Sequence, residues 1–223
     1  MNHYQKNILF VFNYFLRNSY DLMFTDLIAE KPKKYLNYIY IEGKEYVRQL
    51  MDKNSGVILL SGHFGPLFRT LLFKEIFGIS VSSFAAPETI KALKNPSETI
   101  NKMFASAPLY AVGEEEQFQE ALLRKEWISF LNDVPVKKRG DDKYILFGKN
   151  IYLSELPFKI SLKYNIPIMF IGITMIKHQY HVSILPMDNF HTQKEGLKKY
   201  IAMVERMLRC DPYAGNYIEV KHF

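Results

Sequence analysis

The sequence contains little cysteine and no long apolar run. Cys210 is the one cysteine among 223 residues, so no disulfide can form within the chain and we expect a reducing compartment. No stretch approaches the roughly 18 consecutive apolar residues of a membrane-spanning helix. The run 8–16 is too short, is broken by Asn13 and is not followed by a signal-peptide cleavage site. We therefore expect a cytoplasmic protein.

The short motifs that indicate common cofactors are also missing. The chain has no Gly-x-Gly-x-x-Gly, no phosphate-binding Gly-Lys-Ser/Thr loop and no Gly-x-Ser-x-Gly nucleophile elbow. His178 and His181 lie three residues apart, but neither His191 nor Cys210 has ligand-like spacing to them. We expect no cofactor and no metal ion.

The net charge and the aromatic content indicate which kinds of molecule the protein could bind. The net charge of +6 suits an acidic partner, which includes nucleic acid, an anionic membrane surface and an acidic carrier protein. No nucleic-acid-binding motif is recognisable, so we expect no nucleic acid. Aromatic residues make up 15% of the chain, and this favours either extensive buried ring surface or contact with an apolar ligand or membrane.

Strand and helix patterns alternate along most of the chain. We predict strands at residues 38–41, 57–61, 79–85, 109–112, 127–131, 167–176 and 180–185, with the last two joined by residues 177–179. We predict helices at residues 6–29, 43–53, 67–77, 114–125, 155–164 and 192–209, and a hairpin over 144–153 that turns at Gly148-Lys149-Asn150. The alternation predicts an α/β fold, with a mixed, mostly parallel central sheet flanked by helices. We divide the chain into an N-terminal amphipathic helix in residues 1–34 and a single α/β domain in residues 35–223.

The most informative stretch runs from Gly56 to Pro66. Apolar residues between glycines predict a strand buried on both faces, and His63 follows where that strand should stop. Ligands of open α/β sheets bind at the carboxyl ends of strands. An imidazole there could take a proton from an alcohol or amine, and backbone N–H groups at the next helix start could stabilise an oxyanion. This arrangement favours acyl transfer, and a hydrogen-bonded structural histidine is the alternative.

The same stretch belongs to a longer series of motifs in a familiar order. The series is Tyr40-Ile41-Glu42-Gly43, residues 56–65, Asp133 with a basic loop, Phe147-Gly148-Lys149, Pro157, Ile166-Pro167-Ile168, Pro212, Tyr217 and Lys221-His222-Phe223. Over residues 35–223 the chain resembles the bacterial lipid A late acyltransferases, a branch of the lysophospholipid acyltransferase superfamily. The resemblance implies the fold of that superfamily and an enzyme of lipid metabolism.

In that family a histidine general base is followed, after four residues, by an acid that orients it. The resemblance assigns the base to His63, but the acid position falls on Phe68, which is a departure from the family pattern. Asp133, at the end of a neighbouring predicted strand, is the preferred substitute and Glu88 the second. Glu75 is discarded, since a continuous helix would carry it about 10 Å past Phe68.

The resemblance also implies the substrates. A fatty acyl thioester of acyl carrier protein or coenzyme A would be the co-substrate, and a hydroxyl or amine of a lipid, sugar or other small molecule the acceptor. Phe64, Gly65 and Phe68 are candidate acyl-chain contacts, with core packing as the alternative for the two rings. Lys137 and Arg139 are candidates for docking a phosphate or an acidic carrier, with a solvated basic loop as the alternative.

Two further possibilities stay open at this point. The loss of the acid at Phe68 favours a catalytically inactive relative that binds a lipid or an acyl carrier protein. Peripheral contact with the inner face of the cell membrane, through the aromatic N-terminal helix and basic surface residues, is the second.

Overall fold

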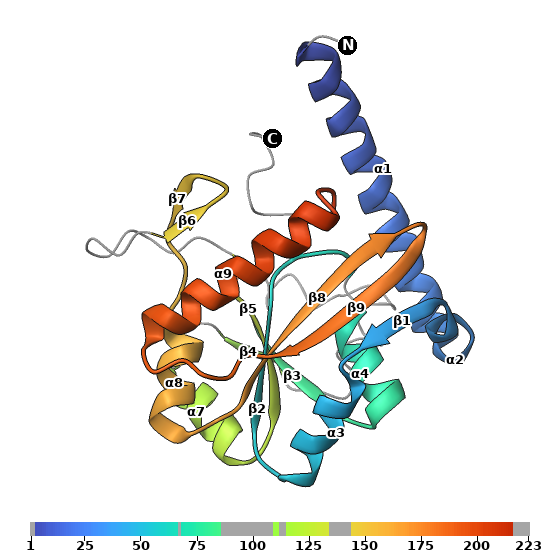
Figure 1. Cartoon of the computed structure of the whole chain (residues 1–223). Helices are drawn as coiled ribbons and strands as arrows, with labels where there is room; N and C mark the ends of the chain where they lie inside the picture. Colours follow the sequence, from blue (N-terminus) through green and yellow to red (C-terminus); the bar gives the residue numbers. More distant parts are fainter. Residues whose placement is uncertain (1–2, 67, 86–108, 112–114, 134–143, 216–223) are drawn as a thin grey trace.

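A seven-stranded sheet forms the centre of the molecule, in the order β1-β9-β8-β2-β5-β3-β4 (Figure 1). The structure is a computed structural model that describes residues 3–66, 68–85, 109–111, 115–133 and 144–215, and the side chains of α1 from Asn13 onward. The strands of this sheet are β1 (Ile39–Glu42), β2 (Val57–Ser61), β3 (Val81–Ala85), β4 (Leu109–Ala111), β5 (Trp127–Leu131), β8 (Ile168–Ile176) and β9 (Gln179–Pro186). A separate hairpin consists of β6 (Tyr144–Leu146) and β7 (Lys149–Ile151).

Helices cover both faces of the sheet. They are α1 (His3–Glu30), α2 (Pro32–Tyr35), the 3-10 turn η1 (Leu36–Tyr38), α3 (Lys44–Asp52), α4 (Arg69–Phe77), α7 (Glu115–Leu123), α8 (Leu156–Tyr164) and α9 (Gln193–Cys210). One buried cluster joins the sheet to α7, α8 and α9, and a second joins it to α1, α3 and α4. This confirms the mixed α/β class predicted from the alternation of patterns.

Every residue of β2 is buried, as the apolar run predicted. Because side chains alternate along a strand, Ile58 and Leu60 pack in the first cluster while Val57 and Leu59 pack in the second. β2 lies between β5 and β8, parallel to both. Because β2 is the middle strand, the turn that follows it leaves the sheet at the centre of one end.

The sheet is mostly parallel, and β8 and β9 are its antiparallel pair. Both hairpins turn over two residues, Lys177-His178 and Phe147-Gly148, and all four have positive φ angles. The turn predicted at residues 177–179 therefore ends one residue too late, and the turn predicted at 148–150 begins one residue and ends two residues too late. A two-residue turn that matches strand twist needs positive φ at both positions, which Phe147 adopts while its N–H donates to Glu205 Oε1 at 2.7 Å.

The C-terminal half of α1 is part of the core, whereas its other end extends beyond the sheet layers (Figure 1). Phe24 and Ile28 are buried in the second cluster. The Arg17 guanidinium contacts Asp21 Oδ1 at 2.8 Å and Asp211 Oδ2 at 2.9 Å. The Tyr180 hydroxyl also donates to Asp21, whose pKa is raised by burial. These contacts hold α1 against β9 and the end of α9.

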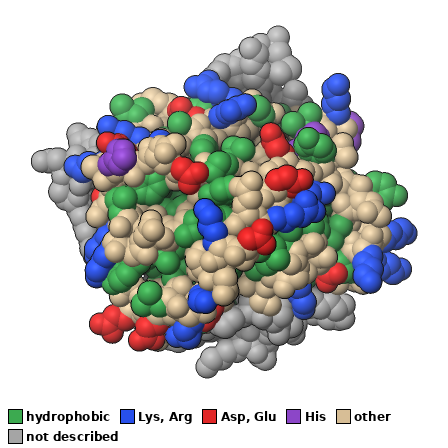
Figure 2. All heavy atoms as spheres, turned by 60° about the horizontal axis from the view of Figure 1, so that its bottom comes forward, with side chains coloured by type: hydrophobic (Ala, Val, Ile, Leu, Met, Phe, Trp, Pro, Cys, Tyr) green, Lys and Arg blue, Asp and Glu red, His purple; other side chains and the backbone are tan. Residues whose placement is uncertain are grey.

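The surface carries charges of both signs. On the face that Figure 2 brings forward, basic and acidic side chains are intermixed with apolar ones. The positive excess of the sequence is therefore not gathered into one patch on this face. Among the helices of the described residues, none combines the length and apolarity needed to cross a bilayer.

Replacing Phe68 by Ala should destabilise the protein strongly. Phe68 is fully buried, with ring centroids 5.9 Å from Phe24 and 5.7 Å from Tyr180. Truncating a buried Phe costs about 3–5 kcal/mol. Phe15→Ala is the matched control, because that ring is 64% exposed and its loss should change the free energy of unfolding by less than about 0.5 kcal/mol. Urea unfolding of both variants measures the difference, and equal costs would contradict the assigned packing.

Candidate active site

The register of β2 and β5 brings two polar side chains together. The last residue pair of the two parallel strands is Ser61 with Leu131, and the Asn132 N–H then donates to the Ser61 carbonyl at 2.8 Å. The chains thus leave the sheet side by side. His63 and Asp133 each come two residues after that last pair, and they meet above the carboxyl ends of the strands.

Asp133 holds His63 at two points. Its Oδ1 lies 2.8 Å from His63 Nδ1, and its Oδ2 accepts the backbone N–H of His63 at 2.8 Å. One carboxylate therefore fixes both the ring and the main chain that carries it. The Asp133 side chain is 0% exposed and that of His63 is 25% exposed, so solvent reaches the ring but not the carboxylate.

The pairing selects the chemical form of the ring. An ionised carboxylate only accepts hydrogen bonds, so the neutral imidazole carries its hydrogen on Nδ1. Nε2 is then the nitrogen with the lone pair. A histidine held in this way can accept a proton from a hydroxyl or amine, and the carboxylate stabilises the imidazolium that forms.

Arg69 supplies a second charge near the buried carboxylate. It is 7% exposed, and its Nη1 donates to the Phe64 carbonyl at 3.4 Å. Burial lowers its pKa to about 10, an effect that the charge of Asp133 opposes. The guanidinium therefore remains a cation at neutral pH and offsets part of the cost of burying Asp133.

Tyr200 packs beneath the same turn. Its hydroxyl donates to the Ser61 carbonyl at 2.9 Å, and burial raises its pKa well above the usual value, so it stays neutral. Sequence reasoning missed both this residue and Arg69. The available signals were an arginine in the apolar first turn of a helix and a tyrosine on the inner stripe of the last helix.

Two positions in the turn that carries His63 have no room for a side chain and are occupied by glycine. A Cβ on Gly62 would lie 2.9 Å from Asp133 Cγ and closer still to the Phe64 ring. Gly65 has a φ of +64°, and its Cβ would lie 2.9 Å from the Ile173 carbonyl oxygen. The structure thus gives Gly65 a clear role in shaping the turn, and its predicted substrate contact stays a prediction.

Two backbone N–H groups of the turn already have acceptors, and the oxyanion role predicted for the N–H groups at the next helix start stays a prediction. The His63 N–H is bonded to Asp133, and the Gly65 N–H donates to the Ala214 carbonyl at 2.8 Å. Neither group can stabilise an oxyanion while those bonds persist. The helix after the turn also begins at Arg69 rather than at residue 67.

The two candidate acyl-chain rings lie in different parts of the core. Phe64 packs with the cluster on the α7–α9 side and Phe68 with the cluster on the α1 side, and both are fully buried. Core packing accounts for each, and their contact with an acyl chain stays a prediction. Lys137, Arg139 and Glu88 lie outside the described residues.

Other polar candidates lie apart from His63. The Ser61 hydroxyl donates to the Ile171 carbonyl at 2.7 Å and is not directed at His63. His178 is in the β8–β9 turn, and the His181 ring packs 5.1 Å from Tyr40. No group of three or more potential metal ligands occurs in the described part of the chain.

Comparison with known proteins does not identify a family for this chain. The sequence matches no protein-family model, and a search of curated proteins gives no match. The functional argument therefore depends on the residues of the site and on the resemblance of its motifs.

Asp133 and Arg69 should be energetically coupled. Removing the cation with Arg69→Met takes away nearby positive charge and the bond to the Phe64 carbonyl, which should cost about 1–3 kcal/mol of unfolding free energy. In an Asp133→Asn background the cost should be smaller by at least about 0.5 kcal/mol. Urea unfolding of the four proteins measures this coupling. Arg48→Met, at a side chain that is 61% exposed, is the control and should have almost no effect. An identical cost of Arg69→Met in both backgrounds would refute the coupling.

Proposed function

We propose that the protein is an acyltransferase with His63 as general base and Asp133 as the residue that orients it. The observation that carries the proposal is the two-point bond between a solvent-reachable imidazole and a buried carboxylate. The acid that the resemblance leads one to expect at Phe68 is replaced, in this proposal, by one at the end of β5. The finer fold assignment, to the lysophospholipid acyltransferase type, belongs to the same proposal.

The reaction follows from the orientation of the ring. Nε2 of His63 takes the proton of an acceptor hydroxyl or amine as its oxygen or nitrogen bonds to the thioester carbonyl carbon. The tetrahedral intermediate then collapses and its C–S bond breaks. The leaving thiolate takes the proton from the imidazolium, which gives an ester or amide, a free thiol and the neutral histidine. Asp133 accepts the hydrogen bond from Nδ1–H throughout.

The donor is a fatty acyl thioester of acyl carrier protein or coenzyme A, and no further cofactor takes part. The net charge of +6 supports an acidic carrier, and the resemblance supports a lipid or small-molecule acceptor. Nucleic acid is not among the proposed partners. The alternative is a catalytically inactive relative that binds lipid or acyl carrier, which the loss of the acid at Phe68 favours and the contact with Asp133 opposes.

We propose a cytoplasmic location with peripheral contact at the inner face of the membrane. Four large apolar side chains of α1 are more than half exposed and lie on one side of the helix: Phe15, Leu16, Leu22 and Met23. An exposed apolar helix face of this kind can lie in a membrane interface.

The direct test of the catalytic proposal uses His63→Gln and Asp133→Asn. With lauroyl, myristoyl and palmitoyl thioesters as donors and a bacterial lipid extract as acceptor, each variant should lose transfer by roughly 10²–10⁴-fold. Thiol release and labelled acyl transfer measure the rate. His191→Gln and Asp52→Asn change exposed residues of the same types and should keep wild-type rates.

The outcomes separate the two candidate functions. Undiminished transfer by folded His63→Gln would dismiss the catalytic role. Absence of transfer by every protein, with acyl-chain binding retained, would establish the inactive relative instead. Thermal unfolding of each variant shows whether a lost rate reflects a lost fold.

The membrane contact predicts that the protein floats with anionic phosphatidylglycerol vesicles at low salt. Replacing Phe15, Leu16, Leu22 and Met23 together by Ser should reduce the bound fraction several-fold, since the apolar face would be lost. Leu123→Ser, on an exposed apolar residue of α7, is the control and should float like the wild type. Wild-type protein that stays at the bottom of the gradient would rule out the contact.

A further inference from the structure

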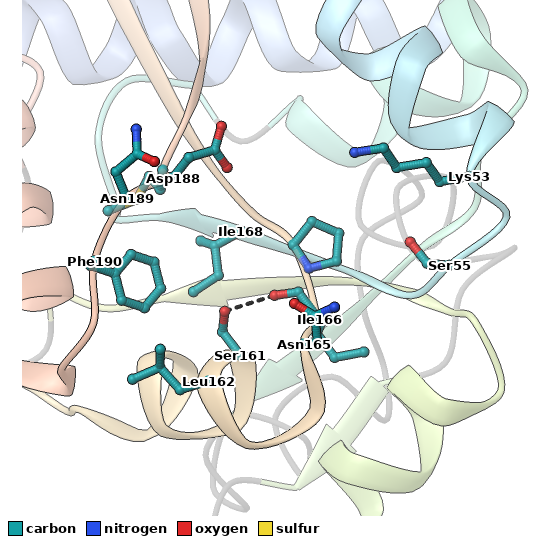
Figure 3. Close-up of a pocket in the computed structure, with 12 residues that line it drawn as sticks. Lys53, Ser55, Ser161, Leu162, Asn165, Ile166, Ile168, Asp188, Asn189 and Phe190 are labelled. Atoms are coloured by element: carbon teal, nitrogen blue, oxygen red, sulfur yellow. Dashed lines mark hydrogen bonds between the residues drawn. The ribbon is translucent and has the colours of Figure 1, made fainter.

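A hollow lies at the amino ends of β2 and β8, at the opposite end of these strands from His63. It has a volume of about 460 Å³ and is bounded by the end of α3, the end of α8, the start of β8 and the loop between β9 and α9 (Figure 3). Ile168 at its floor pairs with Ile58 near the start of β2. The length of β2 separates this hollow from the His63 turn by about 16 Å.

The floor of the hollow is apolar. Ile168 is buried there, Leu162 lies on α8, and Phe190 lies on the loop between β9 and α9 (Figure 3). The Phe190 ring packs edge-on against Phe158, with 5.7 Å between centroids. An apolar group of a ligand would therefore meet a fixed surface of aliphatic and aromatic carbon.

The rim carries two opposite charges that face each other. Lys53 extends from the end of α3 and Asp188 from the loop after β9, and their charged ends point toward one another across the opening (Figure 3). Among the described residues no salt bridge joins these two side chains, so Lys53 Nζ lies more than 4.0 Å from the carboxylate oxygens of Asp188. The Asp188 carboxylate accepts one long hydrogen bond, from the Tyr46 hydroxyl at 3.5 Å.

Two of the segments that line the hollow are held in place by hydrogen bonds. Lys199 Nζ donates to the carbonyls of Asp188 and Asn189 at 2.6 Å each, which uses the backbone of the loop rather than the carboxylate. On the other side, Ser161 Oγ donates to the Ile166 carbonyl at 2.7 Å (Figure 3). A preformed site of this kind loses little entropy when a ligand binds.

We propose that this hollow binds a small zwitterion of the amino-acid class. The ligand carboxylate pairs with Lys53, its ammonium pairs with Asp188, and its apolar side chain lies on Leu162, Ile168 and Phe190. The volume falls within the roughly 300–1,000 Å³ typical of small-molecule sites, which also combine an apolar lining with a few polar groups. The site is independent of the proposed acyl transfer.

Three probes of nearly equal size test the proposal by calorimetry or ligand-observed NMR. L-Phenylalanine carries both charges, 3-phenylpropanoate lacks the ammonium, and 2-phenylethylamine lacks the carboxylate. L-Phenylalanine should bind about ten-fold more tightly than either single-charge probe, because each charge-assisted hydrogen bond contributes on that scale.

Variants at the rim should change affinity in a crossed pattern. Lys53→Gln should weaken L-phenylalanine and 3-phenylpropanoate but leave 2-phenylethylamine unchanged. Asp188→Asn should weaken L-phenylalanine and 2-phenylethylamine but leave 3-phenylpropanoate unchanged. Both residues are exposed, so the variants should fold, and Lys149→Gln on β7 is a control that should bind all probes like the wild type.

The proposal is overturned by any of three results. The first is no binding of L-phenylalanine at millimolar concentration. The second is equal affinity for the three probes. The third is the same loss for every probe in both rim variants, which would indicate a general change in the pocket rather than recognition of two charges.

Discussion

The hydrogen bonds of the Asp133 carboxylate with the Nδ1 atom and the backbone N–H of His63 are the interaction on which the rest of the site depends. They exist because β2 and β5 are parallel neighbours that end in register, so that one loop delivers a base and the next delivers an acid. In the proposed acyltransferase, Asp133 takes the place of the acid that the resemblance leads one to expect at Phe68, and the Phe68 ring packs in the core between α1 and β9. The same constellation of base and orienting carboxylate recurs on unrelated folds, where geometry rather than sequence position identifies it.

A buried carboxylate imposes demands on its surroundings. Arg69 supplies positive charge from inside the core, Gly62 keeps a side chain out of the space that Asp133 occupies, and Tyr200 ties the end of β2 to α9. The amino ends of β2 and β8 are arranged differently, because there Lys53 and Asp188 are exposed and face each other across an apolar hollow. The carboxyl ends of the central strands therefore suit proton transfer at a fixed ring, and their amino ends suit recognition of paired charges.

Most of the helices and strands could be predicted from the sequence, because buried apolar residues recur with the period of a helix or a strand. The apolar run of β2 and the polar residues after β2 and β5 were enough to identify His63 and to favour Asp133. The turn at Phe147 was misplaced because a positive φ at a phenylalanine runs against local preference, and the contact of its N–H with Glu205 is distant in sequence. Arg69 and Tyr200 were missed for the same reason, since their roles come from contacts across the fold. The hollow at Lys53 is assembled from separate segments and left no local pattern.

The state of the His63 ring tests the central claim most directly. Nitrogen-15 NMR of the histidine side chains, with His63 assigned through the His63→Gln variant, reports which ring nitrogen carries the proton in the neutral form. We predict hydrogen on Nδ1 and a lone pair on Nε2 in the wild type, with loss of that preference in Asp133→Asn. A wild-type ring protonated on Nε2, or a ring unaffected by Asp133→Asn, would contradict the account.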